Sequence, residues 1–338
     1  MVVDQAHGRG REAGVGDVLD GRYLLLARAG SGAAGTVWCA RDLSRDIDVA
    51  LKVLRGKHLA SEEILGRFVR EGELAARMLS PHIVRVLSHG ITADNGPYVV
   101  YEHLTGDDLG TVQALRRRLS IVDVRTVVVH TCRALARAHA LGVLHHDVKP
   151  ANLFVTTDLD GRMVVKVLDF GIAEVVGRGF SGEHSLVGTL EYIAPEILFR
   201  EGTADARSDL YSLAVVAYEC LTGQVPYPAQ SVGELVAAFA AGAFPLPTTL
   251  RRGLAPEFDE WFTRALQREP AARFASAKEM AEAFQAVVDS LDSLPTSRVH
   301  ASESSMRARA PSLFDDERPP VTSMIVPTGA PTAIEECE

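Results

Sequence analysis

LHHDVKPANLF, residues Leu144–Phe154, packs two histidines, an aspartate, a lysine and an asparagine between a helical pattern and an apolar one. A soluble domain normally disperses such groups over its surface, so their concentration indicates a site, with a solvated loop as the simpler alternative. Asp147 can accept a proton or orient a hydroxyl, and Lys149 can neutralise a transferring group. Asn152 offers an amide oxygen to a hard metal ion such as Mg2+. The stretch therefore predicts a site whose other members lie elsewhere in the chain.

Two further segments carry ionisable groups next to β-type runs. In VLDFGIAE, Asp169 ends an apolar run at a turn that Gly171 allows, and its carboxylate with Asn152 would supply the oxygen ligands that Mg2+ with bound phosphates requires. In VALKVL, Lys52 lies inside an apolar run, where an ammonium needs an anionic partner unless the strand has a wet face. Glu71, in the helix expected after it, is a candidate partner.

The segment AGSGAAGTV, residues 29–37, has the glycine spacing GxGxxG. Dinucleotide-binding folds share this spacing, but they need a helix directly after the third glycine. Here Thr36, Val37, Trp38 and Cys39 are poor helix starters and continue as a strand. We therefore expect a hairpin loop whose backbone, without side chains at the glycines, contacts phosphates. It is not a Walker loop, because no GK[ST] follows.

Bulk composition excludes several classes of protein. A net charge of -9 and a pI near 5.7 argue against a nucleic-acid surface, and the basic run Arg116–Arg118 is interpreted as a solvated helix end. The four cysteines form no CxxC pair, so neither a zinc site nor a disulfide framework is expected. The start lacks a signal-peptide core, and the apolar stretch 210–221 predicts a buried helix rather than a membrane span. We expect a cytoplasmic protein without nucleic-acid or membrane partners.

Hydrophobic patterning divides the chain into four parts. Residues 1–17 and 291–338 have little to bury and are expected to be disordered. Residues 18–102 carry short β-type runs and one helix, and residues 103–290 carry helices. Ser120, Ser231 and Ser276 each precede an acidic residue by three positions, which is typical of a capping box. The expected fold is α+β, with a small β-rich lobe, a larger helical lobe and a ligand cleft between them.

In this order, the motifs resemble the eukaryotic-type (Hanks-type) protein kinase family, in particular its bacterial serine/threonine branch, over roughly residues 20–290. The matches are the glycine-rich loop, VALK for the family's VAIK, HHD.K..N for HRDxKxxN, DFG at 169–171 and APE at 194–196. The resemblance implies the bilobal protein kinase fold, ATP and Mg2+ as cofactors, and phosphoryl transfer to Ser or Thr hydroxyls of protein substrates in intracellular signalling.

The resemblance also implies a role for each matched residue. Asp147 would orient the attacking hydroxyl, Lys149 would support the γ phosphate, and Lys52, held by Glu71, would reach the α and β phosphates. Asn152 and Asp169 would hold Mg2+. The nucleotide would contact Ala29, Gly30, Ser31, Gly32, Ala33, Ala34, Gly35, Thr36, Val37, Ala50, Lys52, Tyr101, Glu102, Leu104, Leu153 and Asp169.

Within that set, the adenine ring has its own expected contacts. The backbone of Glu102 and Leu104 would meet its edge, Ala50 and Leu153 would sandwich its faces, and Tyr101 would limit the pocket behind it. These assignments come from the resemblance alone.

Other matched positions concern substrate class and structure. Lys149 in DVKPAN and Thr189 in VGTLEYIAPE match the Ser/Thr subgroup. Asp209 resembles the anchoring carboxylate of a buried helix. Arg273 is the expected partner of Glu196, because a guanidinium and a carboxylate can form a bidentate pair.

The chain departs from the family at two positions. His146 replaces the usual arginine before the catalytic aspartate, and a histidine titrates near pH ~6.5, so it is only partly cationic. His145 is expected to pack beneath Phe170. Because His146 replaces an arginine that can clamp a phosphorylated loop, activity is expected to depend weakly on phosphorylation of Ser181, Ser185 or Thr189. The alternative is that Arg178 substitutes for the missing arginine. Ala34 stands where the family often has an aromatic residue, which would shield the phosphates less from water.

Two other classes of function stay open. A pseudokinase would bind nucleotide or a partner without transfer, and the intact Lys52, Asp147, Asn152 and Asp169 weigh against it. A small-molecule kinase is disfavoured by the peptide-docking character of GTLEYIAPE. The tail offers acceptor hydroxyls for autophosphorylation and for a phosphopeptide-binding partner, or it only keeps the protein in solution. The acceptors are Thr322, Ser323, Thr328 and Thr332.

Overall fold

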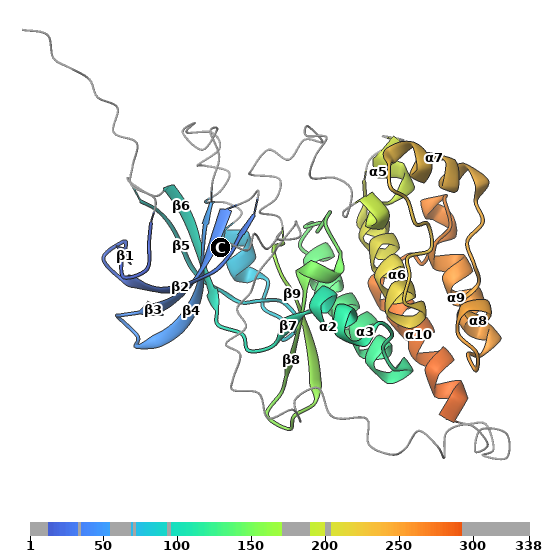
Figure 1. Ribbon diagram of the computed structural model, residues 1–338, viewed down its shortest axis with the longest axis horizontal. Coiled ribbons are helices and arrows are strands. Elements are labelled where there is room, and N and C mark those ends of the chain that lie inside the picture. Colours follow the sequence, from blue (N-terminus) through green and yellow to red (C-terminus); the bar gives the residue numbers. More distant parts are fainter. Residues whose placement is uncertain are drawn as a thin grey trace, which may run out of the picture.

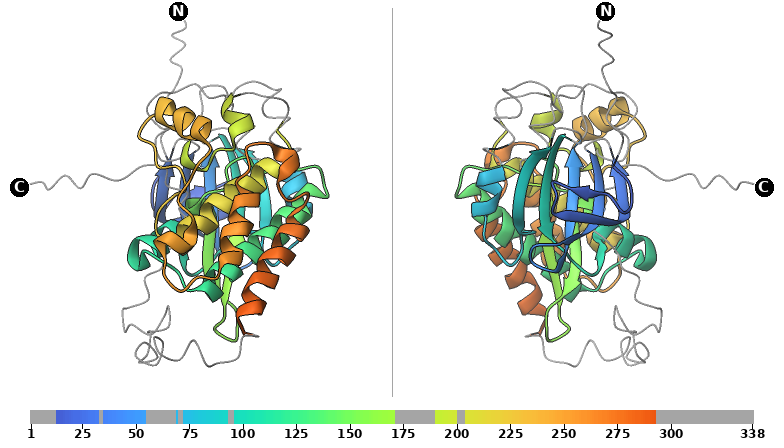
Figure 2. Two further views of the ribbon diagram at one scale, coloured as in Figure 1. Left: turned by 90° about the vertical axis from the view of Figure 1, so that its right-hand side faces the viewer. Right: turned by 90° about the vertical axis from the view of Figure 1, so that its left-hand side faces the viewer.

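The computed structural model describes residues 13–32, 35–54, 69, 72–92, 96–170, 190–199 and 204–292. A six-stranded sheet lies at one end of the molecule, helices lie at the other, and a three-stranded sheet lies between them (Figure 1). Figure 2 views the same arrangement from the helical end and from the sheet end. The predicted α+β fold, with a β-rich N-terminal lobe and a helical C-terminal lobe, is confirmed.

The six-stranded sheet follows the β-type runs seen in the sequence. Its strands are β1 Val18–Leu19, β2 Tyr23–Gly32, β3 Gly35–Asp42, β4 Ile47–Leu54, β5 Val86–Thr92 and β6 Gly96–Glu102. They pair antiparallel in the order β1-β2-β3-β4-β6-β5. Antiparallel neighbours need only short turns, which explains why β1 to β4, and then β5 and β6, follow each other closely in sequence.

A helix over residues 72–77 packs against this sheet. At Gly72 the approach to β5 is very close, since a Cβ built there would lie 2.8 Å from the ring of His89. A larger residue at this position would force the His89 ring to move. The preceding part of the expected helix, including Glu71, lies outside the described residues.

The smaller sheet forms the start of the C-terminal lobe. It consists of β7 Asp107–Asp108, β8 Leu153–Thr157 and β9 Met163–Val167, paired in that order. On its outer side, β9 makes a single parallel bridge between Val167 and Ile83. The sequence indicated only the run that ends at Asp169; the short strand β7 has no pattern of its own.

Helices dominate the other described residues of the C-terminal lobe. They are α2 Leu109–Arg116, α3 Ile121–His139, α5 Pro195–Phe199, α6 Ala206–Thr222, α7 Val232–Ala241, α8 Pro247–Leu250, α9 Pro256–Ala265 and α10 Ala277–Asp292, with short 3-10 turns at Pro150–Asn152, Leu190–Tyr192 and Pro270–Ala272. α6 is buried along most of its length, as predicted for 210–221. Within the described part of the chain, no helix combines the length and apolarity needed to cross a bilayer.

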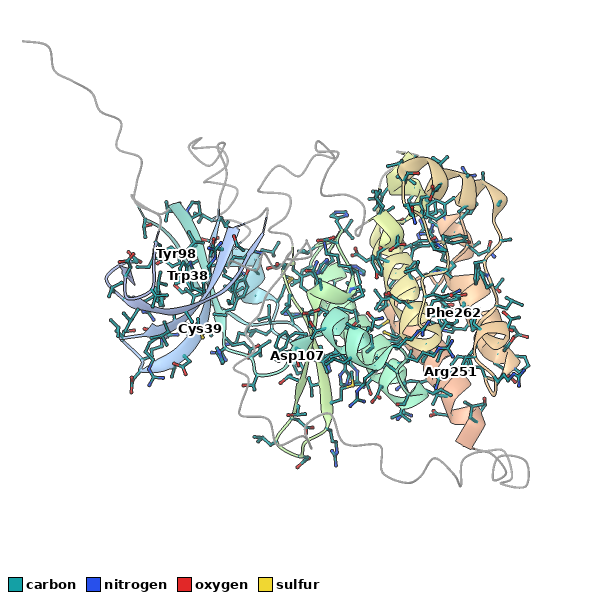
Figure 3. The ribbon with its side chains drawn as sticks, in the orientation of Figure 1. Trp38, Cys39, Tyr98, Asp107, Arg251 and Phe262 are labelled. Atoms are coloured by element: carbon teal, nitrogen blue, oxygen red, sulfur yellow. The ribbon has the colours of Figure 1, made fainter. Side chains whose placement is uncertain are left out.

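Each lobe has its own apolar core. Trp38 and Tyr98 belong to the core of the six-stranded sheet, and Phe262 belongs to the helical core, so these side chains lie in opposite halves of the molecule (Figure 3). The free cysteines of the described residues, Cys39, Cys132 and Cys220, are buried. Burial raises the pKa of the Cys132 thiol, so it behaves as an inert core side chain.

Helix capping follows the sequence. The hydroxyls of Ser120, Ser231 and Ser276 accept hydrogen bonds from the backbone N–H three residues later, at 3.0, 3.2 and 3.1 Å. The run Arg116–Arg118 is exposed at the end of α2, as predicted, and Arg118 also reaches the end of α6. Arg118 Nε donates to the carbonyl of Thr222 at 2.8 Å, and nearby Arg251, labelled in Figure 3, donates to that of Leu221 at 3.1 Å. Guanidinium groups therefore satisfy the last carbonyls of α6.

Candidate active site

The stretch 144–154 forms a loop that gathers three polar side chains. Asn152 Nδ2 donates to the backbone carbonyl of Asp147 at 2.7 Å and to its Oδ2 at 3.0 Å. Lys149 Nζ lies 2.9 Å from the same Oδ2. Because the amide nitrogen of Asn152 is turned toward Asp147, its carbonyl oxygen faces the other way and is the atom left for a cation. The predicted proximity of these three groups is present.

A buried carboxylate on α6 accepts hydrogen bonds from the backbone of this loop. Asp209 accepts hydrogen bonds from the backbone N–H of His145 at 2.9 Å, from that of His146 at 2.8 Å, and from His139 Nε2 at 2.8 Å. Burial alone would raise the pKa of Asp209, but these donors outweigh burial and lower it. The carboxylate also holds His146 in the left-handed region at φ 61°, which a non-glycine residue adopts only under constraint. The expected anchoring role of Asp209 is thus visible.

Asp169 follows β9 and lies beside this loop. The N–H of Leu168 donates to the carbonyl of Asn152 at 2.9 Å, and His145 Nε2 donates to the carbonyl of Leu168 at 2.8 Å. The His145 ring meets the ring of Phe170 edge-on, with centroids 4.8 Å apart, as predicted. Asp169 itself has φ 56°, so the chain turns sharply where the carboxylate projects.

The carboxylate of Asp169 pairs with a lysine of the other lobe. Lys52 Nζ lies 2.7 Å from Asp169 Oδ2, and the two side chains are only 6% and 18% exposed. Lys52 was expected to pair with Glu71, which lies outside the described residues. An ammonium buried on β4 needs an anion, and Asp169 supplies it here.

The glycine-rich segment is the hairpin between β2 and β3, as expected. Gly30 pairs with Val37, Ser31 with Thr36, and Gly32 with Gly35. Gly35 has φ 149°, and a Cβ on it would lie 2.1 Å from the carbonyl oxygen of Val53 on β4. This glycine is therefore required for the close approach of β3 to β4. Ala33 and Ala34 lie outside the described residues.

The apolar residues expected around adenine do not all share one cluster. Ala50, Tyr101 and Leu104 share one buried cluster, and the β8 residue in that cluster is Phe154, not Leu153. Leu153 packs in the main helical core instead. Successive residues of a strand point to opposite faces, so a shift of one position exchanges the two environments.

Two other side chains complete this region. Glu102, at the end of β6, accepts a hydrogen bond from Lys166 Nζ on β9 at 2.6 Å. The Tyr101 hydroxyl is buried and has no hydrogen-bond partner among the described residues. Burial, with Asp169 as a further contributor, raises the pKa of Tyr101, so the phenol stays neutral. Sequence reasoning missed Lys166, and no local pattern distinguishes it from a lysine on a wet strand face.

The APE motif is tied to the helical lobe. Arg273 Nη1 and Nη2 donate to Glu196 Oε1 and Oε2 at 2.9 and 2.7 Å, and Ser208 Oγ donates to Oε1 at 2.7 Å. Burial would raise the pKa of Glu196, but the guanidinium outweighs it and lowers it. The predicted bidentate pair is confirmed. Several other expected residues lie outside the described residues: Gly171, Arg178, Ser181, Ser185 and Thr189.

An open hollow of about 620 Å³ lies against α9, lined in part by Leu246, Glu260 and Arg264. None of the groups described above borders it. The ionisable side chains described above therefore lie around Lys52 and Asp169, away from this hollow.

Known proteins are similar to this chain over most of its length. The protein kinase domain family matches residues 23–287. The serine/threonine-protein kinase PknL of Mycobacterium tuberculosis is 34% identical over 309 residues, which cover 90% of this chain and 76% of PknL. The serine/threonine-protein kinase pkn3 of Myxococcus xanthus is 35% identical over 82% of this chain, which spans 51% of pkn3. The crystal structure of the Mycobacterium tuberculosis PknI kinase domain, 30% identical, superposes with a TM-score of 0.65 over 82% of this chain and 99% of that domain.

Proposed function

Because the chain belongs to the protein kinase domain family and is a bacterial-type protein serine/threonine kinase, we propose that the groups around Lys52, Asp147 and Asp169 carry its phosphoryl transfer from ATP. The observation that carries this assignment is the convergence of three distant segments. The Lys52–Asp169 pair at 2.7 Å joins the two lobes, and Leu168, next to Asp169, hydrogen bonds to Asn152 at 2.9 Å. The site is thus built from the VALK, HHD.K..N and DFG motifs together.

The donor set suits a nucleotide with a divalent cation. Asp169 offers a carboxylate, and Asn152 offers the amide oxygen that its hydrogen bonds to Asp147 turn outward. Hard cations such as Mg2+ prefer oxygen ligands of this kind. Mg2+, when bound, would neutralise charge on the phosphates. Asn152 and Asp169 are the residues that we propose to hold it.

In the proposed reaction, Asp147 orients the acceptor hydroxyl of a Ser or Thr side chain. The hydroxyl oxygen bonds to the γ phosphorus while the bond to the bridging oxygen of ADP breaks, and the hydroxyl proton passes to the Asp147 carboxylate. Lys149, 2.9 Å from that carboxylate, neutralises the γ phosphate, and Lys52 contacts the α and β phosphates. Glu71 is proposed to hold Lys52 in that state.

The nucleotide is proposed to lie between the hairpin and β8. Residues 29–37 cover the phosphates, the backbone of Glu102 and Leu104 meets the adenine edge, and Tyr101 limits the pocket behind. Ala50 packs above the ring. Phe154 takes the place below it that the sequence had suggested for Leu153, since Phe154 shares the cluster of Ala50.

We further propose a cytoplasmic signalling role with protein substrates, including acceptor hydroxyls in the C-terminal tail. The tail then becomes a target for a phosphopeptide-binding partner, because each phosphate adds about two negative charges. Mass spectrometry of the protein after incubation with ATP and Mg2+ tests this: phosphate on the tail threonines supports it, and an unmodified tail contradicts it.

Transfer of radiolabelled phosphate from ATP to a generic protein tests the proposed site. Asp147→Asn should reduce transfer at least about 100-fold, since it removes the proton acceptor. Asp160→Asn, on an exposed turn of the same lobe, serves as the matched control and should leave transfer unchanged. Transfer unaffected by Asp147→Asn would refute the assignment. Nucleotide binding without any transfer by the unmodified protein would favour a pseudokinase, and transfer only to a small molecule such as an aminoglycoside would favour the third alternative.

A further inference from the structure

The strand that leads into Asp169 is held along its outer edge by two kinds of partner. β9 has β8 on one side only, so the N–H and C=O groups on its other side need partners. At Val167 the partners are backbone groups: Val167 N donates to the carbonyl of His82 at 2.8 Å, and Val84 N donates to the carbonyl of Val167 at 3.0 Å. At Val165, two residues earlier on the same edge, both partners are side chains.

Two stacked histidines hold Val165. Its N–H donates to Nδ1 of His130 at 3.2 Å, and its carbonyl lies 3.3 Å from Nδ1 of His82. A carbonyl only accepts and an N–H only donates, so these partners assign a proton to Nδ1 of His82 and leave Nδ1 of His130 bare. The ring centroids are 4.0 Å apart and the planes are inclined by 26°. Two neutral imidazole rings, one with a proton on Nδ1 and one without, thus make the two hydrogen bonds that a residue of a neighbouring strand would otherwise make.

The surroundings keep both rings neutral. Burial, followed by His82 and Arg133, lowers the pKa of His130 to about 4. Burial also lowers the pKa of His82; Arg133 and Lys166 add to this effect and the Val165 carbonyl opposes it. The charged groups that face the pair, Arg133 on α3 and Lys166 on β9, are both cations. A proton on Nδ1 of His130 would moreover remove the acceptor that the Val165 N–H uses.

We propose that His130 and His82 are positioning residues for Asp169. By holding both polar backbone groups of Val165, they fix the register of β9 and thereby the point at which Asp169 leaves the strand. His130 comes from α3, and His82 comes from the turn between the helix 72–77 and β5, so the pair ties that turn and α3 to the strand that ends at the site. The functional part of this inference rests on the proposed role of Asp169 as a metal ligand; the backbone part does not.

Hydrogen exchange of the full chain, followed on peptides covering 163–170 and 209–221, tests the backbone part. His130→Leu keeps apolar volume but removes the acceptor, whereas His130→Asn keeps an acceptor one bond from Cγ, as in Nδ1. His130→Leu should speed exchange in 163–170 by about 10-fold, because a buried N–H is left unpaired, with 209–221 changed by less than about 2-fold. His130→Asn should restore most of the protection. Thr131→Val is the matched control, since the neighbouring Thr131 hydroxyl is buried without a partner among the described residues.

Equal acceleration in both peptides would mean that His130 contributes only to global stability, and unchanged exchange in 163–170 would mean that it does not hold the strand; either result overturns the proposal. If His130→Leu does not fold, His82→Leu replaces it, with a smaller acceleration of about 3-fold expected in the same peptide because only a carbonyl loses its partner. Uniform or absent acceleration in that variant has the same meaning.

The Mg2+ concentration for half-maximal phosphoryl transfer at fixed ATP tests the functional part. It should rise about 5-fold in His130→Leu and stay within about 2-fold of the unmodified value in His130→Asn. Asp169→Asn separates the two ideas. If Asp169→Asn leaves the Mg2+ requirement unchanged, the proposed ligand role of Asp169 fails while the exchange result stands. If Asp169→Asn shifts it and His130→Leu does not, the positioning proposal fails.

Discussion

Asp209→Asn combined with His146→Gly tests how the loop 144–154 is held. Asp209 accepts hydrogen bonds from His145 N, His146 N and His139 Nε2 at 2.8 to 2.9 Å. An asparagine keeps one oxygen and turns its NH2 toward one of these donors, which leaves a buried N–H unpaired at a cost of roughly 1–3 kcal/mol. The other bonds lose their charge assistance as well. We expect the free energy of unfolding in urea to fall by about 3 kcal/mol.

The same substitution should release stored backbone strain. His146 is held at φ 61°, which costs a non-glycine residue roughly 1–2 kcal/mol. With Asp209 intact, the strained conformer remains dominant, so His146→Gly should change kcat little. In Asp209→Asn the strained conformer becomes a minor species, and kcat falls because Asp147 lies in this loop. His146→Gly then favours that conformer by about 1 kcal/mol and should recover about 5-fold in kcat.

The assay is a double-mutant cycle in kcat for a generic protein substrate, with the urea midpoint of each variant as the stability reading. A recovery of kcat only in the Asp209→Asn background supports the reasoning. It would be refuted by equal effects of His146→Gly in both backgrounds, or by an Asp209→Asn variant as stable and active as the unmodified protein.

Four other features can be tested in the same way. Gly35→Ala should destabilise the protein by about 2 kcal/mol and raise KM for ATP, because the new Cβ would lie 2.1 Å from the Val53 carbonyl; unchanged initial-rate kinetics would contradict this. Arg273→Ala should cost about 3–5 kcal/mol in thermal or urea unfolding by leaving Glu196 buried and unpaired, and Arg273→Lys should recover little of it. Because the folded-state pKa of His130, about 4, lies below the ordinary 6.5, the unfolded chain binds the proton first; stability should therefore fall as pH decreases from 6.5 to 4, and His130→Asn should flatten that slope in urea titrations. Phosphatase treatment should leave most turnover intact, since His146 offers little clamp for a phosphorylated loop, and loss of nearly all turnover would refute this.

Much of the site could be predicted because its chemistry is local in sequence. Asp147, Lys149 and Asn152 lie within one loop, and the tight turn at Asp169 was signalled by Gly171. The fold class followed from the change in hydrophobic period after Glu102. The Glu196 and Arg273 pair could be predicted only from the family resemblance, because nothing local links two residues so far apart.

The remaining features depend on register and on long-range packing. Leu153 and Phe154 lie on opposite faces of β8, and the choice between them for the Ala50 cluster depends on which face is which. The five residues of β8 are all apolar or β-branched, so the sequence pattern does not reveal the face. The stack of His82 on His130 joins two segments with no common motif. Each histidine alone is typical of an ordinary surface or core position, so only their tertiary arrangement reveals the pair.

The ion pair between Lys52 and Asp169 has a consequence for how ligands enter. If Lys52 binds phosphate and Asp169 binds a cation as proposed, a phosphate that arrives alone leaves the carboxylate without its counter-ion, and a cation that arrives alone takes the carboxylate from the ammonium. Neither loss arises when both newcomers arrive together. On the proposed roles of the two residues, phosphate and cation should each strengthen the binding of the other by the same factor.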